Sequence, residues 1–101
     1  MLFLEDVGEA PYRIDRMLTQ LRLAGAFDGV RGVVFGAMHA CKDAYNDLRD
    51  VIRDALGGLA FPVAFGLPSG HGPVNLALPL GAQARLDGRV GRFKVARYEA
   101  P

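Results

Sequence analysis

Glu5, a carboxylate, and His71, an imidazole, are the residues of this sequence that could form a catalytic pair. His71 lies between two glycines shortly after an apolar, strand-like run over residues 61–65, and Glu5 ends another such run over residues 1–5. If the two strands are parallel neighbours, both side chains emerge at one sheet edge, where α/β proteins bind ligands. A carboxylate that holds one imidazole nitrogen leaves the other free to take a proton from a nucleophile. The pair would supply two members of a serine-hydrolase triad; the alternative is a structural capping pair.

The elements that position this pair are indicated by the apolar pattern. Apolar runs predict strands over residues 1–5, 32–36 and 61–65, and apolar residues at three- and four-residue spacing predict helices over 11–24 and 43–56. Pro11 suits a first helical turn, and Gly25 suits the end of that helix. Crossover helices between buried strands predict a parallel three-stranded core.

The last third of the chain has a different character. Short strand-like pieces are expected at residues 74–78, 82–86 and 92–96, separated by turn residues. Residues 92–97 alternate polar and apolar side chains, as in an antiparallel strand with one wet face. The expected fold class is therefore α/β, a small parallel sheet with flanking helices plus an antiparallel β unit, in a single domain over residues 1–101.

Composition narrows the partners and the compartment. The chain has 101 residues and a formal net charge of +1, which gives no reason to expect nucleic acid or a membrane surface as partner. No apolar run has membrane-spanning length, and the single cysteine excludes an internal disulfide. We expect a cytoplasmic protein without cofactor or metal, with the reservation that a targeting segment could lie upstream if the chain is a fragment.

Few other residues offer catalytic or ligating chemistry. Ser69 is the only serine and is interpreted as a turn residue, because no oxyanion donors are evident around it. Thr19, the only threonine, is interpreted as a structural helix residue. His39 and Cys41 suggest a metal or thiol site, but the usual close ligand pairs are missing. Cys41 is therefore interpreted as a small buried residue, and the role of His39 stays open.

Several segments carry a resemblance to a known family. They include Leu-Phe-Leu-Glu-Asp-Val-Gly-Glu at residues 2–9 and Pro-Val-Ala-Phe-Gly-Leu-Pro-Ser-Gly-His-Gly at residues 62–72. The others are residues 11–16, 18–21, 32–36, 75–81 and 86–87. In this collinear order, over nearly the whole chain, the sequence resembles the C-terminal domain of the LD-carboxypeptidase family of serine peptidases.

The resemblance implies a swivelling β/β/α-type domain with the triad glutamate at Glu5 and the general base at His71. It places the nucleophilic serine in a separate N-terminal domain, which nothing in these residues matches. That domain is therefore the implied partner, and the isolated chain is expected to be inactive. The family implies cytoplasmic homodimers that remove a terminal D-amino acid from muropeptides, or that cleave microcin-type peptide antibiotics. One departure is Ser69, where relatives often carry a bulkier residue.

Two alternatives from other functional classes stay open. A histidine between glycines also suits a phosphohistidine carrier domain, which does not require a carboxylate such as Glu5 near the histidine. A non-enzymatic interaction module, left after loss of a catalytic half, is the other alternative. Incubation with labelled phosphoenolpyruvate would separate the carrier from the hydrolase, because only a carrier would take up acid-labile phosphate at His71.

Overall fold

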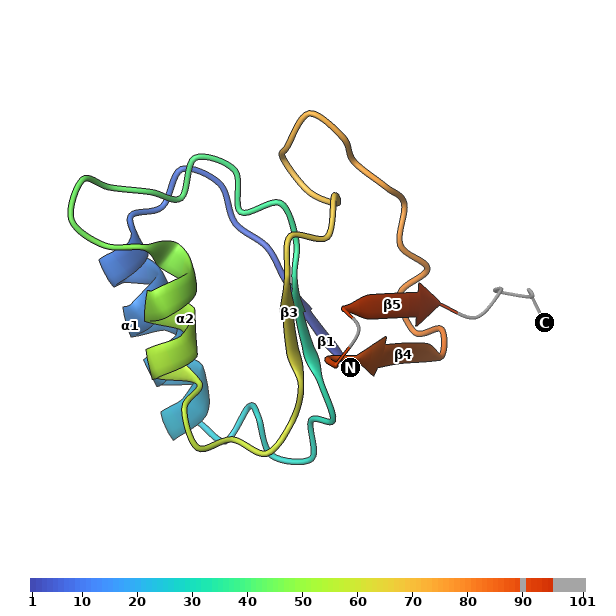
Figure 1. Ribbon diagram of the computed structural model, residues 1–101. Helices are drawn as coiled ribbons and strands as arrows, with labels where there is room; N and C mark the ends of the chain where they lie inside the picture. Colours follow the sequence, from blue (N-terminus) through green and yellow to red (C-terminus); the bar gives the residue numbers. More distant parts are fainter. Residues whose placement is uncertain (90, 96–101) are drawn as a thin grey trace.

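Five strands and two helices make up the part of the chain that the computed structural model describes, residues 1–89 and 91–95 (Figure 1). In chain order they are β1 (Leu2–Leu4), α1 (Pro11–Leu23), β2 (Val33–Phe35), α2 (Leu48–Ala55), β3 (Val63–Phe65), β4 (Ala84–Asp87) and β5 (Arg92–Val95). The strand–helix alternation expected up to residue 65 is present, with shorter elements.

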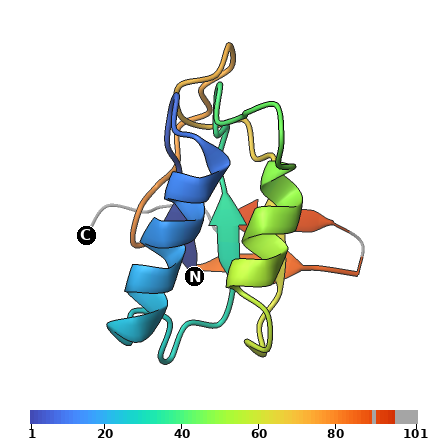
Figure 2. The same ribbon diagram turned by 90° about the vertical axis from the view of Figure 1, so that its left-hand side faces the viewer.

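The strands form two separate sheets, and the parallel sheet is the middle layer of the fold (Figure 1). β1, β2 and β3 lie side by side in that order and run parallel, whereas β4 and β5 pair antiparallel. Both helices cover one face of the parallel sheet, and the β4–β5 hairpin lies on the other (Figures 1 and 2). Right-handed crossovers that add each new strand on the same side carry their helices over the same face. The α/β class is confirmed, with the helices on one face only.

The core lies between the parallel sheet and the helices. The central strand, β2, is buried on both faces, and Val33, Val34 and Phe35 are each at most 1% exposed. The buried helix residues that pack in this core are Ile14, Leu18 and Ile52, together with Leu56 directly after α2. Burying each such side chain stabilises the fold by about 1.5–3 kcal/mol. The strands that lead to Glu5 and His71, β1 and β3, each pair with this buried central strand.

Side-chain hydrogen bonds fix both ends of α2, one from its own N-cap residue and the other from α1. Asp47 caps the start of α2 by accepting a hydrogen bond from the Arg49 backbone N–H at 2.8 Å. The Arg22 guanidinium of α1 donates to the carbonyl oxygens of Ala55 at 3.1 Å and Gly57 at 2.8 Å, at the end of α2. These carbonyls carry the negative end of the helix dipole, so a cation is favourable there. Neither helix of the described residues is long and apolar enough to cross a membrane.

The helix expected over residues 43–56 begins later, at Leu48. The Asp43 carboxylate accepts hydrogen bonds from the backbone N–H groups of Tyr45 and Asn46, both at 2.8 Å, and so closes a turn. Aspartate side chains compete for backbone donors in this way and favour turns over helix interiors. The second aspartate, Asp47, then caps the helix.

The C-terminal third departs from expectation at one segment. Residues 74–78 are not a strand, because both backbone groups of Leu76 are bonded to the loop after β3. The strands expected at 82–86 and 92–96 are present as β4 and β5, and residues 96 and 97 lie outside the described residues. β3 is also less buried than expected. Val63 and Phe65 are 40% and 37% exposed, since β3 is an edge of the parallel sheet.

Candidate active site

The loops that follow β1, β2 and β3 gather at one end of the parallel sheet (Figure 1). Glu5 is the first residue after β1, and His71 lies in the loop after β3. The loops after β1 and β2 pair at Val7 and His39, where the Gly8 N–H donates to the His39 carbonyl at 2.8 Å. The polar residues singled out in the sequence therefore lie at the carboxyl edge of the sheet.

Glu5 and His71 do not come from neighbouring strands, as the sequence interpretation assumed, because β2 lies between β1 and β3. Their side chains meet across the end of β2, at Gly36. A Cβ atom on Gly36 would lie 2.5 Å from the Ser69 carbonyl oxygen and 3.0 Å from Glu5 Cγ. Only a residue without a side chain leaves that passage open.

The carboxylate and the imidazole form a closed pair. Glu5 Oε2 accepts two hydrogen bonds from His71, from ring Nδ1 at 2.8 Å and from the backbone N–H at 3.1 Å. Glu5 Oε1 lies 3.1 Å from the same Nδ1. The Glu5 side chain is 15% exposed and that of His71 61% exposed. The carboxylate is thus enclosed, while the ring faces solvent.

The electrostatics of the pair favour an ionised glutamate. The hydrogen bond from the His71 ring lowers the pKa of the Glu5 carboxyl below its usual value; burial opposes this, and the His71 backbone N–H adds to it. An ionised carboxylate only accepts hydrogen bonds, so Nδ1 carries the ring proton in this contact. The neutral ring then has its lone pair on Nε2, available to accept a proton.

Gly70 is required for this contact. Its φ is +119°, a backbone region that L side chains rarely adopt. A Cβ atom on Gly70 would overlap the Glu5 carboxyl group, with Oε2 only 2.5 Å away. The glycine before His71 therefore lets the carboxylate approach the loop.

Two residues of the same loop hold its shape. The Ser69 hydroxyl, 6% exposed overall, donates to the Leu76 carbonyl at 2.7 Å, in keeping with its interpretation as a turn residue. Asn75 Oδ1 accepts from the Gly70 N–H at 2.9 Å. The sequence analysis assigned Asn75 no role. The signal available was an asparagine in a glycine-rich loop, since asparagine commonly bonds nearby backbone.

His39 and Cys41 do not join the pair. Cys41 is 4% exposed and its Sγ lies 3.7 Å from the His39 carbonyl, as expected of a small buried residue. Burial raises the pKa of the Cys41 thiol, which disfavours the thiolate needed for nucleophilic chemistry. Within residues 1–89 and 91–95, no three histidine, cysteine or acidic side chains converge as a metal site would require.

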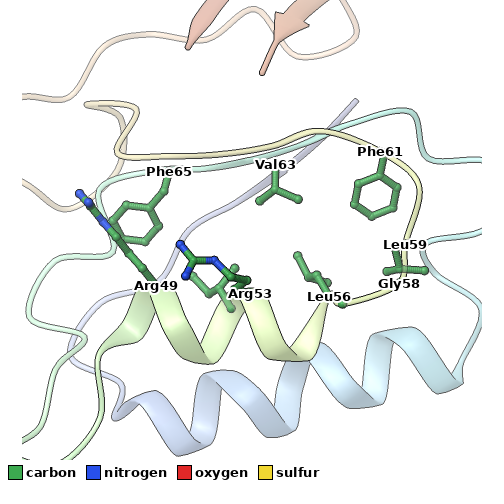
Figure 3. Close-up of a pocket in the computed structure, with 10 residues that line it drawn as sticks. Arg49, Arg53, Leu56, Gly58, Leu59, Phe61, Val63 and Phe65 are labelled. Carbon is green, nitrogen blue, oxygen red and sulfur yellow. The ribbon is translucent and has the colours of Figure 1, made fainter. Parts of the chain in front are cut away.

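A separate groove of about 400 Å³ runs between α2 and β3 (Figure 3). Phe61, Val63 and Phe65 line one side, and the Arg49 guanidinium lies over the Phe65 ring at 5.2 Å. Neither Glu5 nor His71 lines this groove. Its size therefore does not make it part of the candidate active site, which rests on hydrogen-bond geometry.

Fold and site together define a three-layered β/β/α domain that presents an oriented imidazole at the carboxyl edge of its parallel sheet. The sequence model for the C-terminal domain of LD-carboxypeptidases matches residues 1–86. The chain belongs to this family of serine carboxypeptidases.

Individual relatives agree with this assignment. A provisionally named carboxypeptidase of Streptomyces coelicolor is 45% identical over 97 residues, covering 96% of this chain and 31% of the relative. A similarly named protein of Synechocystis is 44% identical, covering 90% and 32%. The crystal structure of muramoyltetrapeptide carboxypeptidase from Oxalobacter formigenes superposes with a TM-score of 0.82 at 30% identity, covering 97% of this chain and 37% of that one. The chain thus spans about a third of the length of the relatives it matches.

Proposed function

We propose that this chain supplies the glutamate and the histidine of a Ser–Glu–His triad in an LD-carboxypeptidase that removes the terminal D-amino acid from muropeptides. The observation that carries the proposal is the Glu5–His71 contact, in which Nδ1 is held at 2.8 Å while the ring is 61% exposed. An imidazole held in this way is oriented for proton transfer through Nε2. The name of the Oxalobacter relative supports the choice of substrate.

In this mechanism the serine comes from the part of the relatives' length that the chain does not span. As the serine Oγ attacks the carbonyl carbon before the terminal residue, His71 Nε2 takes the hydroxyl proton. Nε2 then gives that proton to the leaving amine, which departs as the free D-amino acid. Water then attacks the acyl carbonyl carbon while Nε2 takes a proton from the water, and Nε2 returns that proton to the serine Oγ as the acyl–Oγ bond breaks. Glu5 stays ionised and stabilises the imidazolium.

The same contact favours a base over a phosphohistidine carrier. The Glu5 carboxylate lies against Nδ1, and its negative charge would repel a phosphoryl group approaching the ring. A base benefits from that charge, because it stabilises the protonated ring.

The chain alone is expected to show no peptidase activity. The hydroxyl of Ser69 is buried and already donates to the Leu76 carbonyl, so it is not poised as a nucleophile. The purified chain is incubated with an LD-linked tetrapeptide and assayed for free D-alanine. Turnover that disappears with Ser69→Ala would contradict this expectation.

A chimera tests the proposal directly. The matching third of the Oxalobacter enzyme is replaced by this chain, and release of D-alanine from muramoyl tetrapeptide is measured. We expect turnover, and we expect Glu5→Gln to lower kcat/KM about 10³- to 10⁴-fold, because an amide cannot stabilise the imidazolium. Glu9→Gln, which alters a half-buried carboxylate 3.7 Å from Arg13, is the control, and its kcat/KM should stay near that of the parent chimera. A folded chimera without turnover, or one indifferent to Glu5→Gln, would refute the proposal.

A further inference from the structure

The loop that carries His71 is held at three successive residues. The Ser69 carbonyl accepts a hydrogen bond from the Ala37 N–H at 2.9 Å, and His71 is bonded to Glu5. Between them, the Gly70 N–H donates to Asn75 Oδ1 at 2.9 Å. We propose that Asn75 is a positioning residue: its side-chain oxygen fixes the peptide preceding His71 and so the orientation of the imidazole. The catalytic consequence rests on the proposed function; the structural role does not.

Exposure explains why such a residue is needed. The His71 side chain is 61% exposed, so packing does little to fix its ring. Its orientation therefore depends on hydrogen bonds to the ring and to the adjoining backbone. Gly70 adds freedom, since glycine visits many backbone conformations and here has a φ of +119°. Holding the Gly70 N–H removes that freedom one residue before the ring.

Loop closure by itself does not require Asn75. The Ser69 hydroxyl bonds the Leu76 carbonyl at 2.7 Å, and the Leu76 N–H donates to the Pro68 carbonyl at 2.8 Å. These two bonds close the loop beside Asn75 and survive when its side-chain oxygen is removed. What is lost is the tether on the Gly70 N–H, which acts on the pair and not on the fold.

The first test uses NMR on the 101-residue chain. Asn75→Leu removes the acceptor at similar size, Asn75→Asp keeps an oxygen acceptor, and Asn46→Leu is a matched change in an exposed turn. We expect Asn75→Leu to speed exchange of the Gly70 amide about tenfold or more. The His71 Nδ1–H signal should broaden or disappear as the ring leaves Glu5. Asn75→Asp should retain both signals, and Asn46→Leu should change neither.

Unchanged Gly70 exchange and an unchanged Nδ1–H signal in folded Asn75→Leu would overturn the role of Asn75. If Asn75→Leu does not fold, Asn75→Ser, whose hydroxyl is too short to reach, decides on the same signals. Unfolding of both variants would also overturn the inference, because it assigns Asn75 to loop orientation and not to folding.

The second test measures kcat and KM in the chimera. Asn75→Leu should lower kcat about 10- to 100-fold with little change in KM, since misplacing a catalytic base slows the chemical step. Asn75→Asp should recover most of the loss. An unaltered kcat alongside altered NMR signals would overturn the positioning role. An inactive parent chimera would refute the proposed function alone, because the NMR test needs no turnover.

Discussion

The loops after β2 and β3 leave the same sheet edge with similar residues, yet only one holds an imidazole against a carboxylate. One loop has His39 two residues before Cys41, and the other has Ser69 two residues before His71. In both, the small nucleophilic side chain is buried against a backbone carbonyl, Cys41 near that of His39 and Ser69 near that of Leu76. The two loops differ in what their histidines do.

The His39 side chain is exposed, and His39 contacts the loop after β1 through its backbone, because its carbonyl accepts a hydrogen bond from the Gly8 N–H. His71 bonds Glu5 through its ring and its backbone N–H together. The backbones differ as well: the β2 loop places Met38 and Ala40 at φ of 46° and 56°, where the β3 loop uses glycines. A histidine at the sheet edge therefore becomes a candidate base only where glycines let a carboxylate reach it.

The sharpest test of this contrast exchanges the two histidines for alanine in the chimera. His71→Ala should lower kcat/KM about 10⁴-fold, because it removes the proposed base. His39→Ala should stay within about twofold of the parent, because its backbone contact survives the substitution. Steady-state release of D-alanine measures both. Comparable losses from the two variants would mean that the edge as a whole is the site, and the distinction between the loops would fail.

Gly70→Ala and Gly66→Ala separate the approach of the carboxylate from backbone strain. Both glycines have positive φ, so alanine costs each about 1–3 kcal/mol of strain. A Cβ at Gly70 overlaps the Glu5 carboxyl group, whereas a Cβ at Gly66 meets nothing within 4 Å.

We therefore expect kcat to fall about 10²- to 10³-fold with Gly70→Ala, because the Glu5–His71 contact cannot form as observed. Gly66→Ala should lower the unfolding free energy with kcat near the parent. Urea denaturation and turnover of each variant provide the two readouts. Equal activity of the two variants would show that strain alone explains the glycine at Gly70.

The position of the pair was predictable from the sequence because it depends on topology. Apolar runs ending at Glu5 and before His71, with helices between them, are enough to place both at the carboxyl edge of a parallel sheet. That the pair spans an intervening strand was not predictable, because it depends on the missing side chain of Gly36. Apolar patterns say which runs are strands and do not say what crosses their ends.

The errors in the fold have local causes. Asp43 and Asp47 are both suitable N-cap residues. Asp43 closes a turn in the structure, so the helix begins after Asp47. Residues 74–78 have the composition of a strand, but both backbone groups of Leu76 bond the loop that carries His71. Asn75 was missed for the same reason: its partner, the Gly70 N–H, is identifiable only once that loop is folded.

Ser69→Ala and Cys41→Ala compare the two buried nucleophilic side chains. Ser69→Ala leaves the Leu76 carbonyl without its donor and should lower the free energy of unfolding by about 1–2 kcal/mol. Cys41→Ala leaves a small cavity and should cost about 1 kcal/mol. Neither should lower kcat of the chimera more than about tenfold, since neither group enters the proposed reaction. A loss of all turnover in Ser69→Ala alone would identify that hydroxyl as a nucleophile and break the parallel between the loops.

The smallest expected effect concerns the pH dependence of stability, and it isolates the contact that only the β3 loop makes. Because the contact with His71 lowers the pKa of Glu5 in the folded chain, Glu5 binds its proton more readily when unfolded. The stabilisation is therefore present above the ordinary value of 4.5 and is lost as the pH falls from there through the folded pKa. Urea unfolding should show that the free energy of unfolding of the parent exceeds that of Glu5→Gln, and that this difference narrows as the pH falls across that acidic window. His39→Ala should track the parent throughout, and a gap independent of pH would show that Glu5 does not gain its stability as a carboxylate.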